Sequence, residues 1–285
     1  MGKSNKEKKG LIYNLRSQIR EDRTSFIVYS VLRTLVILTA VRCFFQNNYE
    51  GLALCVLSLV LFLLPALFER ALRINIPAGF EITIYLFIFA AEILGEINKY
   101  YTRIPGWDTM LHTLNGFLCA AIGFSLVYIL NASQDGLNLS PFYLTVVAFC
   151  FSMTVGVVWE FIEFSADQLF HLDMQKDFIV GTISSVKLDP ENSQVPFMIK
   201  DIANTIIETK GGEQFLVNGG YLDIGIIDTM KDLFVNLVGA LTYSIFGYFY
   251  LKHSKAGKEM NRQDQFVQSM ILQKADSGKT SEEDK

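Results

Sequence analysis

The feature that most constrains the fold of this chain is the gathering of its apolar residues into six long blocks, separated by polar segments. A helix needs about 20 predominantly apolar residues to cross the hydrocarbon core of a bilayer, and each block is of that order. The blocks cover residues 25–45, 51–68, 78–97, 107–130, 141–167 and 226–251. The sequence therefore predicts an all-α, multi-pass (polytopic) membrane protein with six transmembrane helices.

Composition agrees with this fold and excludes several classes of protein. Half of the 285 residues, 51%, are hydrophobic and 19% are charged, which argues against a disordered chain and against a soluble globular enzyme. The net charge of −4 gives no electrostatic basis for binding nucleic acid. All four cysteines lie inside apolar blocks, so they are interpreted as small apolar side chains rather than as disulfides or zinc ligands.

The distribution of lysine and arginine predicts the orientation in the membrane. Residues 1–24 form a basic segment, and the tail 252–285 carries further lysines, whereas the connection between the first two blocks has no basic residue. Because cytoplasmic flanks are enriched in Lys and Arg, both termini are expected in the cytoplasm. The long connection 168–225 is then extracytoplasmic.

Two regions outside the blocks differ in character. The polar cytoplasmic tail 252–285 is expected to be disordered. Within the connection 168–225, the segments FIVGTISSVKL and EQFLVNGGYLDIG suggest a short hairpin, and PFMIKDIANTII has the spacing of a helix lying on the membrane surface. A structured cap without a binding role is an equally simple interpretation of this connection.

Ionisable residues recur at helical spacing in the third to sixth blocks, where each is costly in a bilayer. Residues three, four or seven apart share one face of a helix, so each block presents one polar stripe. The stripes comprise Glu92 and Glu96; Asp108, His112 and Asn115; Glu160, Glu163 and Asp167; and Asp228, Asp232 and Asn236.

The predicted topology brings all four stripes to the extracytoplasmic surface at similar depth. Carboxylates gathered there require protons, basic partners or a cation, because like charges in a buried site repel each other. An oxygen-rich group with one imidazole suits Mg²⁺, Mn²⁺ or Ca²⁺. The candidate metal ligands are Asp108, His112, Glu160, Glu163, Asp167, Asp228 and Asp232, and the candidate catalytic residues are His112, Glu163 and Asp232.

A simpler alternative treats the same residues as independent interfacial charges. Asp108 and Asp228 stand in the first turns of their helices, where a carboxylate caps free N–H groups. Glu96 and Asp167 can lie in headgroup water.

Three motifs, GWDTMLHTLNGF, WEFIEFSADQLF and DTMKDLFVNLVGAL, carry a resemblance to a known family. In this order they resemble the YjdF-type family of bacterial inner-membrane proteins, whose function is unknown. The resemblance is best over residues 78–251 and implies a location in the bacterial plasma membrane. It also implies that the polar residues of the three motifs act together. The sequence departs from the family between Asp167 and Asp228, where a shorter connection is expected, so the resemblance implies no role for residues 176–222.

Three classes of function fit these features. The first is a metal-dependent enzyme that hydrolyses or transfers a group of a lipid-linked substrate, with membrane lipid as its partner. The second is a cation or proton-coupled transporter, although the acids lie near one surface and no internal repeat is evident. The third is a non-catalytic assembly protein in which a cation holds the helix ends together.

Overall fold

The computed structural model describes residues 23–134, 138–256 and 262–274. Six helices in this part of the chain are long and apolar enough to cross a membrane, which confirms the predicted all-α, six-span fold. They run over Arg23–Phe45, Tyr49–Leu72, Ala78–Ile97, Trp107–Ser133, Pro141–Phe170 and Ile226–Ser254. Residues 1–22 of the predicted basic segment lie outside the described residues.

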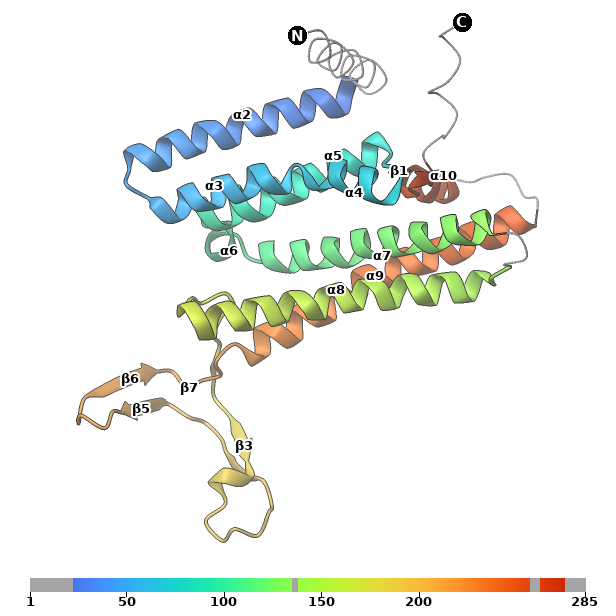
Figure 1. The fold of residues 1–285 in the computed structure, drawn as a ribbon. Helices are drawn as coiled ribbons and strands as arrows, with labels where there is room; N and C mark the ends of the chain where they lie inside the picture. The colour runs from blue at the N-terminus through green and yellow to red at the C-terminus, as the bar shows by residue number, and fades with distance from the viewer. Residues whose placement is uncertain (1–22, 135–137, 257–261, 275–285) are drawn as a thin grey trace, which may run out of the picture.

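The helices run side by side along one common direction (Figure 1). The first, fourth, fifth and sixth spans are single helices: α2 (Arg23–Phe45), α7 (Trp107–Ser133), α8 (Pro141–Phe170) and α9 (Ile226–Lys255). The second span divides into α3 (Tyr49–Leu61) and α4 (Leu64–Leu72), and the third continues from α5 (Ala78–Ile88) into the π-helix η1 (Phe89–Ile97). A short helix, α6 (Tyr100–Arg103), leads into α7.

Glycines allow α7, α8 and α9 to pack closely as a three-helix unit. A Cβ at Gly116 would collide with the backbone carbonyl of Asn236, and one at Gly239 with that of Thr113. A Cβ at Gly156 of α8 would likewise lie only 2.7 Å from Nδ2 of the Asn236 side chain. Gly116 and Gly239 thus permit close helix contact, and the three helices are consequently fixed in register.

The remaining spans pack around large apolar side chains. Val36 of α2, Cys55 of α3, Phe62 after α3 and Tyr85 of α5 are buried in one cluster, with the ring centroids of Phe62 and Tyr85 5.6 Å apart. The other sides of these helices expose many large apolar residues, as expected of surfaces that contact lipid.

The chain between α8 and α9 forms short strands that project from one end of the bundle (Figure 1). The strands pair antiparallel as β2 (Ile179–Val180) with β7 (Tyr221–Leu222), β3 (Ile183–Ser185) with β4 (Phe197–Ile199), and β5 (Asn204–Glu208) with β6 (Gln214–Asn218). The two segments predicted as a hairpin pair with each other only through β2 and β7. We call the end of the bundle that carries these strands the loop end.

The predicted surface helix over residues 196–207 is wrong, because this segment contains β4 and the start of β5. Asp201 has φ 52°, in the left-handed region, and this interrupts any helix at that point. The β-branched pair Ile206 and Ile207 then favours an extended chain that pairs with β6.

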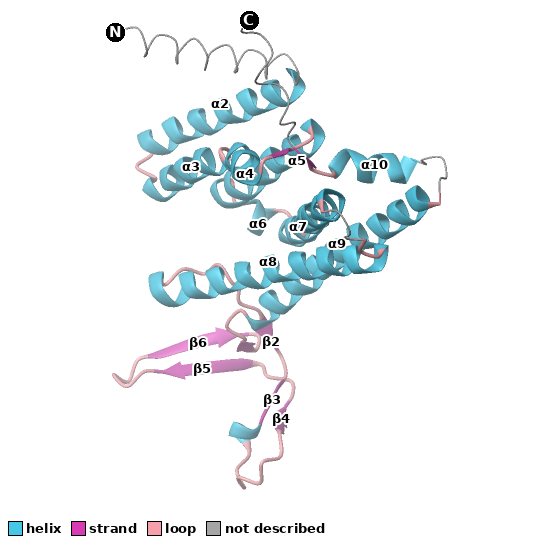
Figure 2. Ribbon diagram, turned by 45° about the vertical axis from the view of Figure 1, so that its right-hand side comes forward, coloured by secondary structure: helices cyan, strands magenta, loops and turns pink. Residues whose placement is uncertain are grey.

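The predicted disorder of the tail 252–285 is wrong for residues 262–274. The helix α10 (Arg262–Met270) lies against α9 and α5, and β8 (Gln273–Lys274) pairs with β1 (Ile74–Asn75) (Figure 2). Val267 is fully buried, and the backbone N–H of Leu272 donates to Ser125 Oγ at 3.0 Å. A few apolar residues in a polar segment thus suffice to dock it. Residues 257–261 and 275–285 lie outside the described residues.

Candidate functional site

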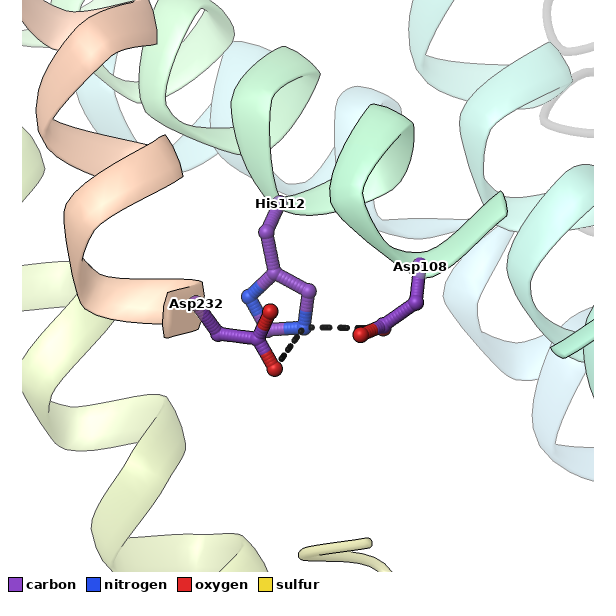
Figure 3. A group of neighbouring side chains, drawn as sticks. All are labelled: Asp108, His112 and Asp232. Carbon is purple, nitrogen blue, oxygen red and sulfur yellow. Dashed lines mark ion pairs between the residues drawn. The ribbon is translucent and has the colours of Figure 1, made fainter. Parts of the chain in front are cut away.

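Three side chains from α7 and α9 meet at the loop end of the bundle (Figure 3). Each helix begins directly after a glycine with positive φ, Gly106 or Gly225, which turns the chain into the helix at the same end. His112 Nε2 lies 3.4 Å from Asp108 Oδ1 and 3.7 Å from Asp232 Oδ2. One ligand atom from each residue falls within 4.8 Å of the other two. We call Asp108, His112 and Asp232 the central group; among the described residues it is the one set whose spacing suits a shared metal ion.

Lys231 extends over the central group from α9. Its Nζ lies 3.6 Å from Asp108 Oδ2, 3.8 Å from Asp228 Oδ1 and 3.9 Å from Asp232 Oδ1. Lys231 is one of the few basic residues that the sequence offers near the polar stripes. It stands three residues after Asp228, and this spacing, which puts both on one face of α9, was the sequence signal for the contact.

Two carboxylates of α8 form a second layer beside the central group. Glu160 and Glu163 are buried, and both lie within electrostatic range of His112. Trp159 Nε1 donates to Glu163 Oε1 at 2.8 Å, which fixes the orientation of that carboxylate. Glu160 Oε2 is buried and accepts no hydrogen bond from the described residues.

Asp167 and Asp228 bind backbone groups of the connection that follows α8. Asp167 accepts from the N–H groups of Met174 and Gln175 at 2.7 and 2.9 Å, and Asp228 Oδ2 accepts from that of Lys176 at 2.9 Å. Asp167 is thereby committed to the turn and lies outside the central group. Asp228 contributes its other oxygen toward Lys231, so it joins the turn to the site.

Asp223, which the sequence analysis did not single out, holds the start of α9. Its carboxylate accepts from the backbone N–H groups of Phe178 at 2.6 Å, Ile227 at 2.9 Å and Gly225 at 3.3 Å. Desolvation raises the pKa of Asp223, but these N–H donors outweigh it and hold the pKa below its usual value. Its place just before the helix was the sequence signal for a cap.

A layer of polar contacts closes the site on the side of the membrane interior. Asn115 Nδ2 donates to Asn236 Oδ1 at 3.2 Å, and Ser152 Oγ donates to the Gly116 carbonyl at 2.7 Å. Asn236 is almost fully buried. The layer joins α7, α8 and α9 directly beneath the central group.

Glu92 and Glu96 of η1 form no ion pair with the central group within the described part of the chain. Glu96 interacts electrostatically with Asp108 and Lys176, whereas the charged neighbour of Glu92 is Glu96. The structure therefore divides the predicted stripes into a compact group, a second layer on α8, two carboxylates engaged with the turn, and an outlying pair on η1.

Comparisons with known proteins identify relatives without assigning them an activity. Residues 28–187 match the family described as predicted membrane protein (DUF2238). The matched range includes Asp108, His112, Glu160, Glu163 and Asp167 and ends before α9.

A protein of Thermotoga maritima described as uncharacterized is 23% identical over 105 residues, which cover 37% of this chain and 53% of that protein. The match thus spans about half of the relative's length. No solved structure matches the chain.

Proposed function

From the premise that this chain belongs to the DUF2238 family of predicted membrane proteins, we propose that it is a metal-dependent enzyme acting on a lipid-linked substrate. It resides in the bacterial plasma membrane with both termini in the cytoplasm, so that the loop end faces outward. The observation that carries the proposal is the convergence of Asp108, His112 and Asp232 at the loop end.

Unsatisfied carboxylate oxygens support a cation at this position. Asp232 Oδ1 and Glu160 Oε2 are buried and have no hydrogen-bond partner among the described residues. Buried polar atoms are normally satisfied, and exceptions point to an ion or water. Two carboxylates and one imidazole, with further carboxylates nearby, favour Mg²⁺, Mn²⁺ or Ca²⁺.

The surroundings of the central group suit chemistry on a lipid headgroup. The group lies near the ends of transmembrane helices, where the polar part of a membrane lipid lies. A bound divalent cation would polarise a phosphoryl or acyl oxygen. Glu163, held by Trp159 beside the central group, is placed to take a proton from an attacking water.

Transport is less well supported because packed side chains separate the central group from the interior of the bundle. Asn115, Asn236 and Ser152 are bonded across the three helices below the central group. Deeper in the bundle, the rings of Phe117 and Tyr243 pack with centroids 5.0 Å apart. A cation passing between α7 and α9 would have to separate both layers.

Metal binding by the full-length protein in lipid nanodiscs tests the proposal. Mn²⁺ affinity is measured by electron paramagnetic resonance, and turnover is followed in a labelled bacterial lipid extract with and without Mn²⁺. Asp232→Asn should weaken Mn²⁺ binding by at least about tenfold and abolish turnover, because it removes a ligand charge. Asp201→Asn, which removes an exposed carboxylate from the connection between α8 and α9, should change neither the affinity nor the turnover.

Unaltered Mn²⁺ affinity in Asp232→Asn would refute the metal centre. Binding without lipid turnover but with Mn²⁺ flux in proteoliposomes would establish transport instead. Binding with neither activity would leave the cation a structural role, and the enzyme proposal would fail.

A further inference from the structure

We propose that Lys231 is a displaceable counter-ion that a divalent cation expels and that then binds the phosphate of the substrate. The substrate class is accordingly a lipid with a phosphate group. This inference rests on the proposed function and adds to it the substrate chemistry and the order of binding.

The ammonium group of Lys231 is shared among three carboxylates. Lys231 Nζ lies at 3.6–3.9 Å from oxygens of Asp108, Asp228 and Asp232, so it occupies the space that these carboxylates share. None of the three separations is as short as a charge-assisted hydrogen bond, which is typically about 2.7–2.9 Å. The ammonium is thus held by the field of several carboxylates rather than by one fixed bond.

The Lys231 side chain is exposed enough to leave this position. The Lys231 side chain is 39% exposed, whereas those of Asp228 and Asp232 are 7% and 3% exposed. A lysine carries its charge on a flexible four-carbon stem, so the ammonium can move outward without any shift of α9. The carboxylates, fixed by close helix packing, stay behind as ligands.

The balance of charge at the site favours a divalent cation. Without a divalent cation, five carboxylates outnumber the two basic side chains, His112 and Lys231, that form ion pairs with them among the described residues. The carboxylates belong to Asp108, Asp228, Asp232, Glu160 and Glu163. That field repels an anionic headgroup. A divalent cation at the central group offsets part of this negative charge and repels the ammonium of Lys231.

The displaced ammonium then remains beside the cation at the mouth of the site. Two adjacent positive charges at this depth suit a phosphate, which accepts charge-assisted hydrogen bonds from lysine. A neutral ester or glycosidic group carries no charge that a second cationic partner would balance. The cation must bind first, because only its arrival frees Lys231 for the substrate.

The proposal makes two predictions of opposite sign for one substitution. Lys231→Met removes the competitor, so Mn²⁺ should bind at least about tenfold more tightly. The same variant should lose the Mn²⁺-dependent binding of short-chain phosphatidic acid. Lys231→Arg should keep the lipid binding. Lys210→Met, which removes an exposed lysine from the connection between α8 and α9, should match the unaltered protein in both assays.

Inorganic phosphate in a parallel titration separates a lipid ligand from free phosphate. Binding of phosphatidic acid but not of inorganic phosphate at equal concentration supports a lipid substrate; equal binding of both would overturn the lipid assignment. Unchanged or weaker Mn²⁺ binding in Lys231→Met would overturn the displacement.

A measurement on the unaltered protein tests the displacement without a variant that could misfold. Reductive methylation of Lys231, quantified by mass spectrometry, should rise at least about threefold on addition of Mn²⁺, because the ammonium leaves its ion pairs. A constant rate despite measured Mn²⁺ binding would refute the inference while leaving the metal centre intact. Absence of Mn²⁺ binding would instead refute the proposed function itself.

Discussion

The unit formed by α7, α8 and α9 differs from the unit formed by α2, α3 and α5 in what its helices bury. The first encloses Glu160, Asp232 and Asn236, whereas the second encloses chiefly apolar and aromatic side chains. Arginines of the second unit stay at its surface: Arg33 donates to Tyr29 Oη at 3.0 Å and Arg42 to Asn98 Oδ1 at 3.4 Å.

Close helix packing accounts for this difference. Glycines at the α7–α9 contact bring the backbones together, so side chains that project from each helix near its end are forced into one small volume. In the second unit, large side chains hold the helices apart, and the charged side chains stay in contact with the surroundings. A site that needs fixed ligands is therefore better supported by the first unit.

The largest expected effect comes from substitution at the α7–α9 contact. Gly116→Leu would place a side chain against the backbone carbonyl of Asn236, which cannot move aside as a flexible side chain can. We expect loss of the folded protein, or destabilisation of more than about 3 kcal/mol. Thermal unfolding of purified protein in detergent measures it.

Gly79→Leu on α5 is the matched control, since an added Cβ there meets no atom within 4 Å. Its stability should stay within about 1 kcal/mol of the unaltered protein. Equal losses in the two variants would remove the proposed distinction between the two units.

A second prediction concerns α10, which contacts both units through α9 and α5 (Figure 2). Val267→Asp would place a charge at a fully buried position and should undock α10 at a cost of about 3–5 kcal/mol. Hydrogen exchange of residues 262–274 should increase, while Mn²⁺ binding at the opposite end is unchanged.

Gln265→Asp adds the same charge at an exposed position of α10 and should have little effect. If Val267→Asp lost Mn²⁺ binding and Gln265→Asp kept it, α10 would also support the loop end. The two units would then be coupled more strongly than their separate cores suggest.

The six spans were predictable because apolar length is a strong and local signal. Their ends agree with the structure within a few residues: the predicted block 107–130 corresponds to Trp107–Ser133. The tail helix was not predictable from composition, since α10 is polar overall and docks through Val267, Met270 and two residues that follow it. Such docking depends on a surface formed by distant parts of the chain.

The i, i+4 spacing in the sequence revealed the polar stripes of α7 and α9. It did not reveal the distances between side chains of the two helices. Spacing places Asp108 and His112 on one face, whereas the approach of Asp232 depends on how α9 packs against Gly116. Asp167 shows the converse: it continues a stripe in sequence, yet it binds the turn because the chain reverses there. Periodicity along one helix does not specify tertiary partners.

The smallest predicted effect distinguishes a structural aspartate from those of the central group. Asp223→Asn removes the carboxylate that accepts from Phe178 and Ile227, so hydrogen exchange of these two amides should increase by about fivefold. Because the pKa of Asp223 lies below its usual value, the ionised carboxylate stabilises the junction above about pH 4 and this contribution disappears as the pH falls through the lowered pKa. Protection factors of the unaltered protein should fall over that range, and those of Asp223→Asn should not. Mn²⁺ affinity at neutral pH should be the same in both, and a loss in the variant would show that the start of α9 and the central group are one unit.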